Sequence, residues 1–172
     1  QAFEDQTGGL LRKDDFLPLP CPNPECVSLT YLLRLDDDSY VPFPKFVDMR
    51  KYLDLLSQSA TIEPNQATED ALHEIITDLW STAGEVPDSD RITHALRRAV
   101  REMYPQTKAD WRELIRASER QAKSIFIHHY MDPFNFDLAR VVKCCHHYPR
   151  VNGRVMPICA FNVFHRNKEE NP

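Results

Sequence analysis

The sequence predicts an α+β fold in which a helical middle is flanked by short strands, with the two ends joined by a cysteine-ligated metal site. Three observations support this prediction. The middle of the chain repeats apolar residues at helical spacing. The segments on either side are rich in β-branched and aromatic residues, as strands are. All five cysteines lie in two groups near the ends: Cys21, Cys26, Cys144, Cys145 and Cys159.

The composition is typical of a single globular domain. The 172 residues are enough to bury a core, and 42% hydrophobic with 27% charged residues fits the soluble class. No apolar run approaches the roughly 20 residues that cross a bilayer, so we expect a cytoplasmic protein, with peripheral membrane contact as an alternative. The net charge of −5 argues against a nucleic-acid partner. Residues 1–15 lack the features of a signal peptide and read as a lead-in from a longer chain.

The first third predicts one strand and one helix. Residues 27–35 are β-branched and apolar, which is typical of a strand, and the polar residues 36–39, DDDS, predict a turn. Pro42 and Pro44 argue against regular structure up to residue 44. From Val47 the apolar spacing predicts a helix, with Asp48 as its N-cap.

Three amphipathic helices follow in the middle. Thr68 is the predicted cap of the first, the second ends before Pro105, and a capping box at Thr107 and Asp110 opens the third. We interpret their apolar stripes as core packing rather than as a face that binds a cofactor. The stripe residues are Leu72, Ile75, Ile76, Leu79 and Trp80; Ile92, Ala95, Leu96, Ala99, Val100 and Met103; and Trp111, Leu114, Ile115 and Ser118.

The last third predicts short elements. Residues 124–132 form a strand pattern, 133–136 a turn, and 137–145 a short helix. The apolar side of that helix is expected to hold Leu138, Val141, Val142 and Cys145. Residues 151–154 predict a hairpin turn in which Gly153 takes a positive φ. Residues 155–161 then predict a strand that carries Cys159.

The cysteines predict a metal site built from two half-sites. Pro22 and Pro24 stiffen the loop that holds Cys21 and Cys26, so the two thiols can face one centre. Cys144 or Cys145, at a helix end, and Cys159 form the second half-site, which leaves one cysteine over. Four thiolates suit tetrahedral Zn²⁺, iron or an iron–sulfur cluster. The spacing matches none of the standard CxxC patterns.

Other interpretations of these residues stay open. A disulfide is less favoured because no secretion signal is present. Some of the cysteines could be small buried apolar residues. The histidines nearby could supply a metal ligand, and a Cys–His nucleophile pair is a further alternative; the four histidines are His128, His129, His146 and His147. The sequence holds no P-loop, no GxSxG elbow and no HExxH motif.

Several ordered blocks resemble the carboxy-terminal region of a family of radical S-adenosylmethionine enzymes, which includes the tetraether lipid synthases and the dihydropterin methyltransferase-like enzymes. The blocks are PLPCPNPECVSLTYLL, YVPFPKFVD, IFIHHYMDPFNFDLARVVKCCHHY, NGRVMPICAFN and VFHR. The resemblance covers residues 16–60 and 124–166, while the helical middle carries no motif. Ile158 stands where the family pattern has a phenylalanine before the cysteine. Residues 149–151 stand where that pattern has a turn of small or acidic residues.

The resemblance implies that residues 1–172 are a single auxiliary iron-binding domain that follows a partial α/β barrel. Its predicted parts are the lead-in 1–15, the first half-site and strand 16–60, the helices 61–123, the second half-site 124–166 and the tail 167–172. The implied ligands of iron or a 4Fe–4S cluster are Cys21, Cys26, Cys159 and one of Cys144 and Cys145, the other of which is expected not to ligate.

The resemblance also implies what lies outside this sequence. The CxxxCxxC loop that binds the S-adenosylmethionine-cleaving 4Fe–4S cluster is absent here, so that cluster and S-adenosylmethionine are expected on an upstream core of the same chain. Alone, these 172 residues are expected to be inactive, and no catalytic residue is predicted among them.

The expected partners are the upstream core, an electron donor, and a lipid or other hydrophobic substrate. The leading hypothesis is radical C–C bond formation between lipid tails. One alternative is a zinc-binding interaction module, and another is a methyltransferase of a pterin-like small molecule.

Overall fold

The computed structural model describes residues 2–19, 23–58, 62–82, 84–106, 109–151 and 153–166. The predicted ligand Cys21, the predicted cap Thr107 and the tail 167–172 lie outside these ranges. The chain divides into two compact units. The helical unit comprises Gln1–Leu17 and Leu29–Phe126, and the cysteine unit comprises Pro18–Ser28 and Ile127–Pro172. The prediction of a single domain stays a prediction.

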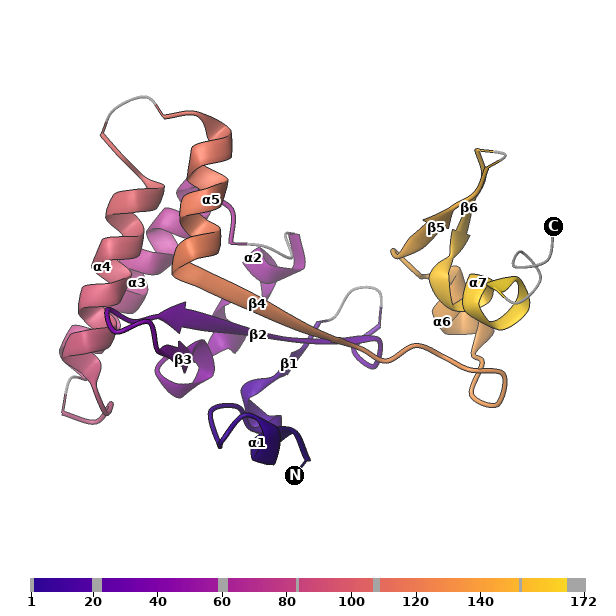
Figure 1. The fold of residues 1–172 in the computed structure, drawn as a ribbon, viewed down its shortest axis with the longest axis horizontal. Helices are drawn as coiled ribbons and strands as arrows, with labels where there is room; N and C mark the ends of the chain where they lie inside the picture. The colour runs from indigo at the N-terminus through magenta and orange to yellow at the C-terminus, as the bar shows by residue number, and fades with distance from the viewer. Residues whose placement is uncertain are drawn as a thin grey trace. The chain divides into compact units, whose positions relative to one another are not determined.

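A sheet with four described strands gives the helical unit its frame (Figure 1). Its order is β1 (Leu17–Pro18), β2 (Val27–Arg34) and β3 (Tyr40–Pro42), and β4 (Ala122–His128) also pairs with β2. β2 and β3 are antiparallel, with Leu33 opposite Val41. β2 confirms the strand predicted at 27–35, and it is almost wholly buried, as its apolar sequence requires.

The prediction that Pro42 and Pro44 exclude regular structure was wrong. Pro42 ends β3, an edge strand of the described sheet, where a missing backbone donor is tolerated. Pro44 lies in the first turn of a 3-10 helix, Phe43–Lys45, where its fixed φ is compatible with helical geometry.

A short helix α1 (Ala2–Gln6) and a 3-10 turn (Lys13–Asp15) precede the sheet.

The first predicted helix begins as a 3-10 turn, Met49–Tyr52, and continues as α2 (Leu53–Gln58). Asp48 caps it as predicted, because its Oδ1 accepts a hydrogen bond from the Arg50 backbone N–H at 3.2 Å.

The three middle helices are α3 (Gln66–Ser81), α4 (Ser89–Met103) and α5 (Trp111–Gln121). The predicted cap of α3 was wrong: Asn65 is the N-cap, and its Oδ1 accepts from the Thr68 N–H at 3.0 Å. Asp110 is the N-cap residue of α5 but makes no side-chain capping bond.

Most of the predicted stripe residues of α3 and α4 are buried, with Ala95 and Leu96 fully enclosed. Trp80 is an exception at 77% exposure. At about 100° per residue it lies about 80° around the helix from Leu72, at the margin of the stripe. In α5 the predicted stripe residue Ser118 is buried, Leu114 and Ile115 are half-buried, and Trp111, at the start of the helix, is exposed. The helix also buries Ala117 and Gln121, which were not predicted.

The cysteine unit contains α6 (Leu138–Val142), β5 (His147–Pro149), β6 (Val155–Pro157) and α7 (Ile158–Phe164). β5 and β6 form an antiparallel hairpin, which confirms the predicted turn, and Gly153 has φ +75°. The strand predicted at 124–132 is observed as β4 and ends at His128.

Two predictions for the cysteine unit were wrong. The strand predicted at 155–161 stops at Pro157, which is the N-cap of α7, so Cys159 lies on a helix rather than on a strand. The cause is Pro157, which has no N–H for a ladder and whose fixed φ fits the start of a helix. Of the expected apolar side of α6, only Val141 is buried, because a helix of five residues is too short to present a stripe.

Candidate metal centre

Cys26, of the first cysteine group, lies beside the side chain of Arg140 on α6 in the cysteine unit. Its Nη2 donates to Cys26 Sγ at 3.2 Å and to the His129 carbonyl oxygen at 3.3 Å. The hydrogen bond to Cys26 raises the pKa of Arg140, and the charges of Cys26, Glu25 and Cys159 raise it further. Cys26 is thus a direct neighbour of Arg140, although the two residues are far apart in the sequence.

Backbone hydrogen bonds position Cys26. Its N–H donates to the Asn23 carbonyl at 2.9 Å, and its own carbonyl accepts from the His129 N–H at 2.8 Å. Asn23 Oδ1 accepts from the Glu25 N–H at 2.9 Å, which is the side-chain turn that asparagine favours. The half-buried thiol of Cys26 is thus held at a defined place next to residue 129.

The second cysteine group is organised around the carbonyl oxygen of His146. Cys144 Sγ donates to it at 3.1 Å, and the Ile158 N–H donates to it at 3.0 Å. Cys144 thereby lies close to Ile158, the first residue of α7, and Cys159 is the next residue of that helix. Cys159 is buried with Met131 and Val141 in a small core, whereas Cys145 is exposed.

The described cysteines Cys26, Cys144 and Cys159 are free thiols. Within the described ranges, no three His, Cys, Asp or Glu side chains are grouped so that they could hold a metal ion. Because Cys21 lies outside those ranges, the predicted four-thiolate set includes a residue that the structure does not describe. The ligand assignment therefore stays a prediction.

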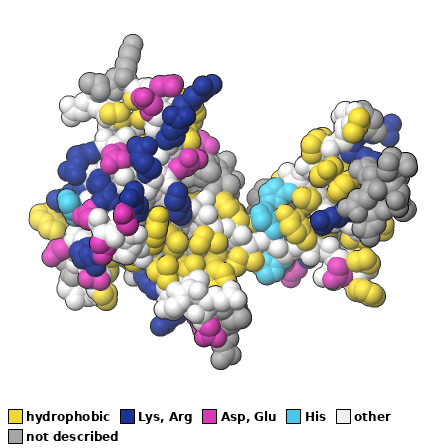
Figure 2. Space-filling model, in the orientation of Figure 1, with side chains coloured by type: hydrophobic (Ala, Val, Ile, Leu, Met, Phe, Trp, Pro, Cys, Tyr) yellow, Lys and Arg dark blue, Asp and Glu magenta, His cyan; other side chains and the backbone are white. Residues whose placement is uncertain are grey.

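The histidines of the cysteine unit gather on one face, as Figure 2 shows. The rings of His128 and His146 have centroids 4.9 Å apart, and His128 stacks on Tyr130. Burial lowers the pKa of His128, and the neighbouring His146 and His129 lower it further. A neutral imidazole at neutral pH can pack against other rings, so these contacts account for the His128 side chain without a metal.

Arg140 is the functional candidate that the sequence did not indicate. Its side chain is only 13% exposed, and its Nε is buried without a hydrogen-bond partner in the part of the chain that the structure describes. Its nearest carboxylate, Glu25, is 3.8 Å from Nη1 and 78% exposed. One arginine in a short helix carries no sequence signal; only the fold brings it to Cys26.

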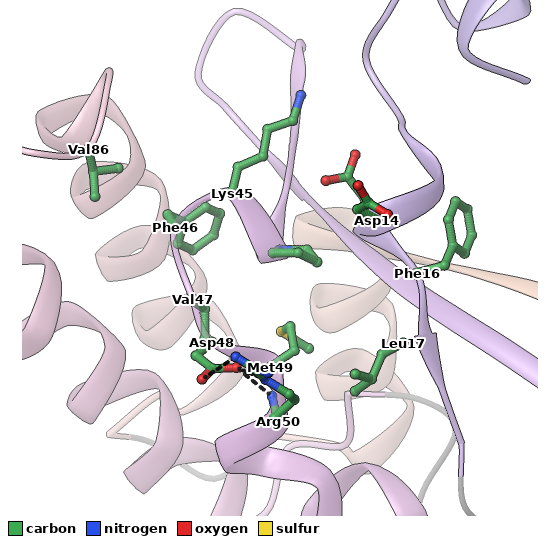
Figure 3. A pocket seen from close by; sticks show the side chains of 12 residues that line it. Asp14, Phe16, Leu17, Lys45, Phe46, Val47, Asp48, Met49, Arg50 and Val86 are labelled. Atoms are coloured by element: carbon green, nitrogen blue, oxygen red, sulfur yellow. Dashed lines mark hydrogen bonds and ion pairs between the residues drawn. The ribbon is translucent and has the colours of Figure 1, made fainter. Parts of the chain in front are cut away.

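A cavity of about 570 Å³ lies in the helical unit, whose sequence contains no cysteine (Figure 3). Asp48 and Arg50 pair at its edge, with Arg50 Nε donating to Asp48 Oδ1 at 2.9 Å. These hydrogen bonds lower the pKa of Asp48. Apolar side chains, among them Phe16 and Phe46, line much of the rest. The cavity has room for a small molecule, but none of the predicted site residues belongs to it.

No known protein-family profile matches the chain. It is 24% identical, over 195 aligned positions, to the 7,8-dihydro-6-hydroxymethylpterin dimethyltransferase of Methanocaldococcus jannaschii. The alignment covers 99% of this chain, and the chain spans 37% of the length of that relative. The relative's name corresponds to one of the two activities in the family that the sequence blocks resemble. The similarity therefore supports the coarser part of that resemblance, a relation to radical S-adenosylmethionine enzymes.

Proposed function

We propose that this chain is the auxiliary iron-binding domain of a radical S-adenosylmethionine enzyme. The observation that carries the proposal is the hydrogen bond that the mostly buried Arg140 donates to Cys26 Sγ at 3.2 Å. The similarity to the pterin dimethyltransferase over nearly the whole chain supports it independently.

Among the described residues, no set of side chains that could hold a metal is grouped around Arg140; the feature that favours an anionic group there is its buried Nε–H. A buried guanidinium is costly unless anions or acceptors surround it, and the Arg140 Nε–H is left without an acceptor among the described residues. Thiolates and the sulfides of a cluster are anionic acceptors of this kind. The residues that would hold the group are Cys21, Cys26, Cys144 and Cys159. We choose Cys144 over the exposed Cys145 because Cys144 is half-buried and lies near the start of α7.

When bound, an iron centre of this type would supply one-electron transfer near the substrate. S-adenosylmethionine and its own 4Fe–4S cluster belong, in this proposal, to an upstream core, because the sequence has no CxxxCxxC loop. The proposed reaction is radical C–C bond formation on a lipid tail. A second candidate is methyl transfer to a pterin, which the name of the M. jannaschii relative favours.

Anaerobic reconstitution with iron and sulfide tests the proposal. We expect one iron centre per chain with visible thiolate–iron absorption, and we expect Cys26→Ala and Cys159→Ala to lose it. We also expect no reductive cleavage of S-adenosylmethionine to 5′-deoxyadenosine by these 172 residues. A colourless protein that binds zinc would favour the interaction module, and cleavage of S-adenosylmethionine would place the catalytic centre within this chain.

Substrate binding separates the two candidate reactions. Equilibrium dialysis of the reconstituted protein against 6-hydroxymethyl-7,8-dihydropterin tests the pterin, and co-sedimentation with lipid vesicles tests the lipid. Saturable binding of the pterin without vesicle binding would support methyl transfer, and the reverse would support the lipid reaction.

A further inference from the structure

We infer that the cavity of the helical unit binds a flat, amino-substituted nitrogen heterocycle, whose N–H groups donate to the carboxylate of Asp15. Guanine and the pterins share the edge that this requires, a ring N–H next to an exocyclic amino group. Every residue that lines the cavity belongs to the helical unit. The inference therefore needs no metal and is independent of the proposed iron centre.

The cavity has the size of a small-molecule site and is built from linked segments. Its volume of about 570 Å³ falls in the range of ligand pockets, roughly 300–1,000 Å³. Residues 14–17 and 44–50 supply most of its lining. Lys45 Nζ donates to the Leu10 carbonyl oxygen at 2.9 Å, which ties the second segment to the chain just before the first. The cavity is thus formed before a ligand binds.

Asp15 gives the cavity a buried hydrogen-bond acceptor. The residue is only 7% exposed, and its Oδ2 accepts from the Arg12 backbone N–H at 2.7 Å. Among the described residues, no hydrogen bond or ion pair engages its Oδ1. Buried carboxylates are costly unless donors surround them, and a carboxylate has about four acceptor positions. Because Asp15 lines the cavity, a ligand with N–H groups can supply the missing donors.

Aromatic rings favour a flat ligand. Phe16 and Phe46 flank the cavity in Figure 3, and both side chains are half-buried. Each ring is held by a second one: Phe16 packs edge-on against Phe3 with centroids 5.5 Å apart, and Phe46 packs against Phe43 at 5.1 Å. A planar heterocycle in the cavity can pack against these fixed rings, which an aliphatic amine cannot do equally well.

The charges of the lining exclude an anionic ligand. Asp48 and Arg50 bind each other, with Arg50 Nε 2.9 Å from Asp48 Oδ1, so their charges largely cancel. The remaining charged residues are Asp14, Asp15 and Lys45, two carboxylates against one ammonium group. Phosphate and carboxylate ligands are therefore disfavoured. A neutral heterocycle that presents two neighbouring N–H donors fits this balance, since carboxylates accept such pairs of hydrogen bonds.

A purely structural role of Asp15 makes a different prediction. Its bond to the Arg12 N–H closes the 3-10 turn Lys13–Asp15, and that bond alone could require the carboxylate. Asp15→Asn separates the two roles, because the asparagine Oδ1 can still accept from the Arg12 N–H. Its amide N–H₂ replaces the second acceptor with a donor and would repel the donors of the ligand.

Isothermal titration calorimetry on the iron-free 172-residue protein tests the inference, under anaerobic conditions. The probes are guanosine, 6-hydroxymethyl-7,8-dihydropterin, and inosine, which differs from guanosine only by lacking the amino group. We expect guanosine to bind about 10- to 100-fold more tightly than inosine, the value of a hydrogen bond to a charged group. Tighter binding of the dihydropterin than of guanosine would identify a pterin site, and the reverse order a nucleobase site.

Variants locate the binding. Asp15→Asn should weaken guanosine and dihydropterin binding by at least about 10-fold. Phe46→Leu, which keeps the carboxylate and an apolar side chain, should weaken it by about 3- to 10-fold. The charge-matched control is Asp90→Asn, at an exposed position of α4 in the same unit, and should bind like the wild type.

The outcomes separate this inference from the proposed function. Wild-type protein that binds neither guanosine nor the dihydropterin would overturn the inference and leave the iron centre untouched. Unchanged affinity in Asp15→Asn would overturn it as well. If circular dichroism shows that Asp15→Asn does not fold, the wild type decides: equal affinities for guanosine and inosine would contradict the inference. Failure of iron uptake would overturn the proposed function alone.

Discussion

The helical unit has a large apolar core, whereas the cysteine unit has a small one. β2, α3 and α4 bury Leu33, Leu79, Ile92 and Leu96 at 2% exposure or less. The corresponding cluster of the cysteine unit comprises Met131, Val141 and Cys159, with Phe136, Ile158 and Ala160 partly buried against it. Small units with so little core generally need a metal, a disulfide or a partner for stability. The comparison indicates that the two units are stabilised by different interactions.

The surface of the cysteine unit also indicates that apolar packing contributes little to its stability. Phe134 is 99% exposed, and Leu138, Val142 and Val155 are each more than 60% exposed. The apolar side chains of α6 thus contribute little to the packing of this unit. Of its described thiols, Cys26 accepts a hydrogen bond from Arg140 and Cys144 donates one to the carbonyl of His146. In the proposed function, metal binding supplies the stability that this small apolar core does not.

Removal of the metal is expected to have the largest effect and to affect only one unit. Binding of a structural metal by thiolates contributes on the order of 10 kcal/mol, and this free energy is also folding free energy. Chelation should therefore abolish amide protection in β5, β6 and α7 while leaving α4 protected. Hydrogen exchange with mass spectrometry measures both. Equal loss in α4 would show that the two units depend on the same interactions.

Leu96→Ala tests whether iron binding depends on the apolar core of the helical unit. Leu96 is fully buried in α4, so its truncation leaves a cavity and should cost about 2–5 kcal/mol in the unfolding of the helical unit. Urea denaturation followed by circular dichroism gives this value, and Arg97→Ala on the exposed side of α4 is the control. Iron content should stay at the wild-type level; a parallel loss of iron would contradict the separation of the units.

Alkaline pH should destabilise the helical unit through Tyr31. Burial raises the pKa of Tyr31 to about 12, while its ordinary value is 10.0. The contribution of the neutral Tyr31 side chain to the free energy of unfolding is complete below pH 10. It is lost as the pH rises from 10 towards 12, which lowers the free energy of unfolding by about 2–3 kcal/mol in all. Tyr31→Phe should flatten this part of the stability profile, whereas the exposed Tyr130→Phe of the cysteine unit should not. An unchanged slope in Tyr31→Phe would contradict a closed core at β2.

Asn65→Ala is expected to have the smallest effect. It removes the side-chain acceptor of the Thr68 N–H at the start of α3 and should cost about 1 kcal/mol. Thr68→Val, which keeps the backbone N–H and removes only the hydroxyl, is the comparison in urea denaturation. A larger loss in Thr68→Val than in Asn65→Ala would restore Thr68 as the cap.

Long elements with a regular pattern could be predicted from the sequence. β2 has an uninterrupted β-branched and apolar run, and α4 has a strong 3.6-residue periodicity, so local preference and burial agree there. Gly153 was predictable because a hairpin turn favours a positive φ. The helix that carries Cys159 was missed because the residues around Pro157 read equally well as a strand. Arg140 could not be predicted, since its partners Cys26 and the His129 carbonyl meet it only through tertiary structure.

The central claim is that the two cysteine groups share one metal centre, and peptide-resolved alkylation tests it most directly. The reconstituted protein and its chelated form are treated with iodoacetamide under anaerobic conditions, and each cysteine is quantified by mass spectrometry. We expect metal to protect Cys21, Cys26, Cys144 and Cys159 together and to leave Cys145 reactive. Cys26→Ala should then expose Cys159 to alkylation as well. Protection of Cys159 that persists in Cys26→Ala, or protection of neither group by metal, would contradict the account.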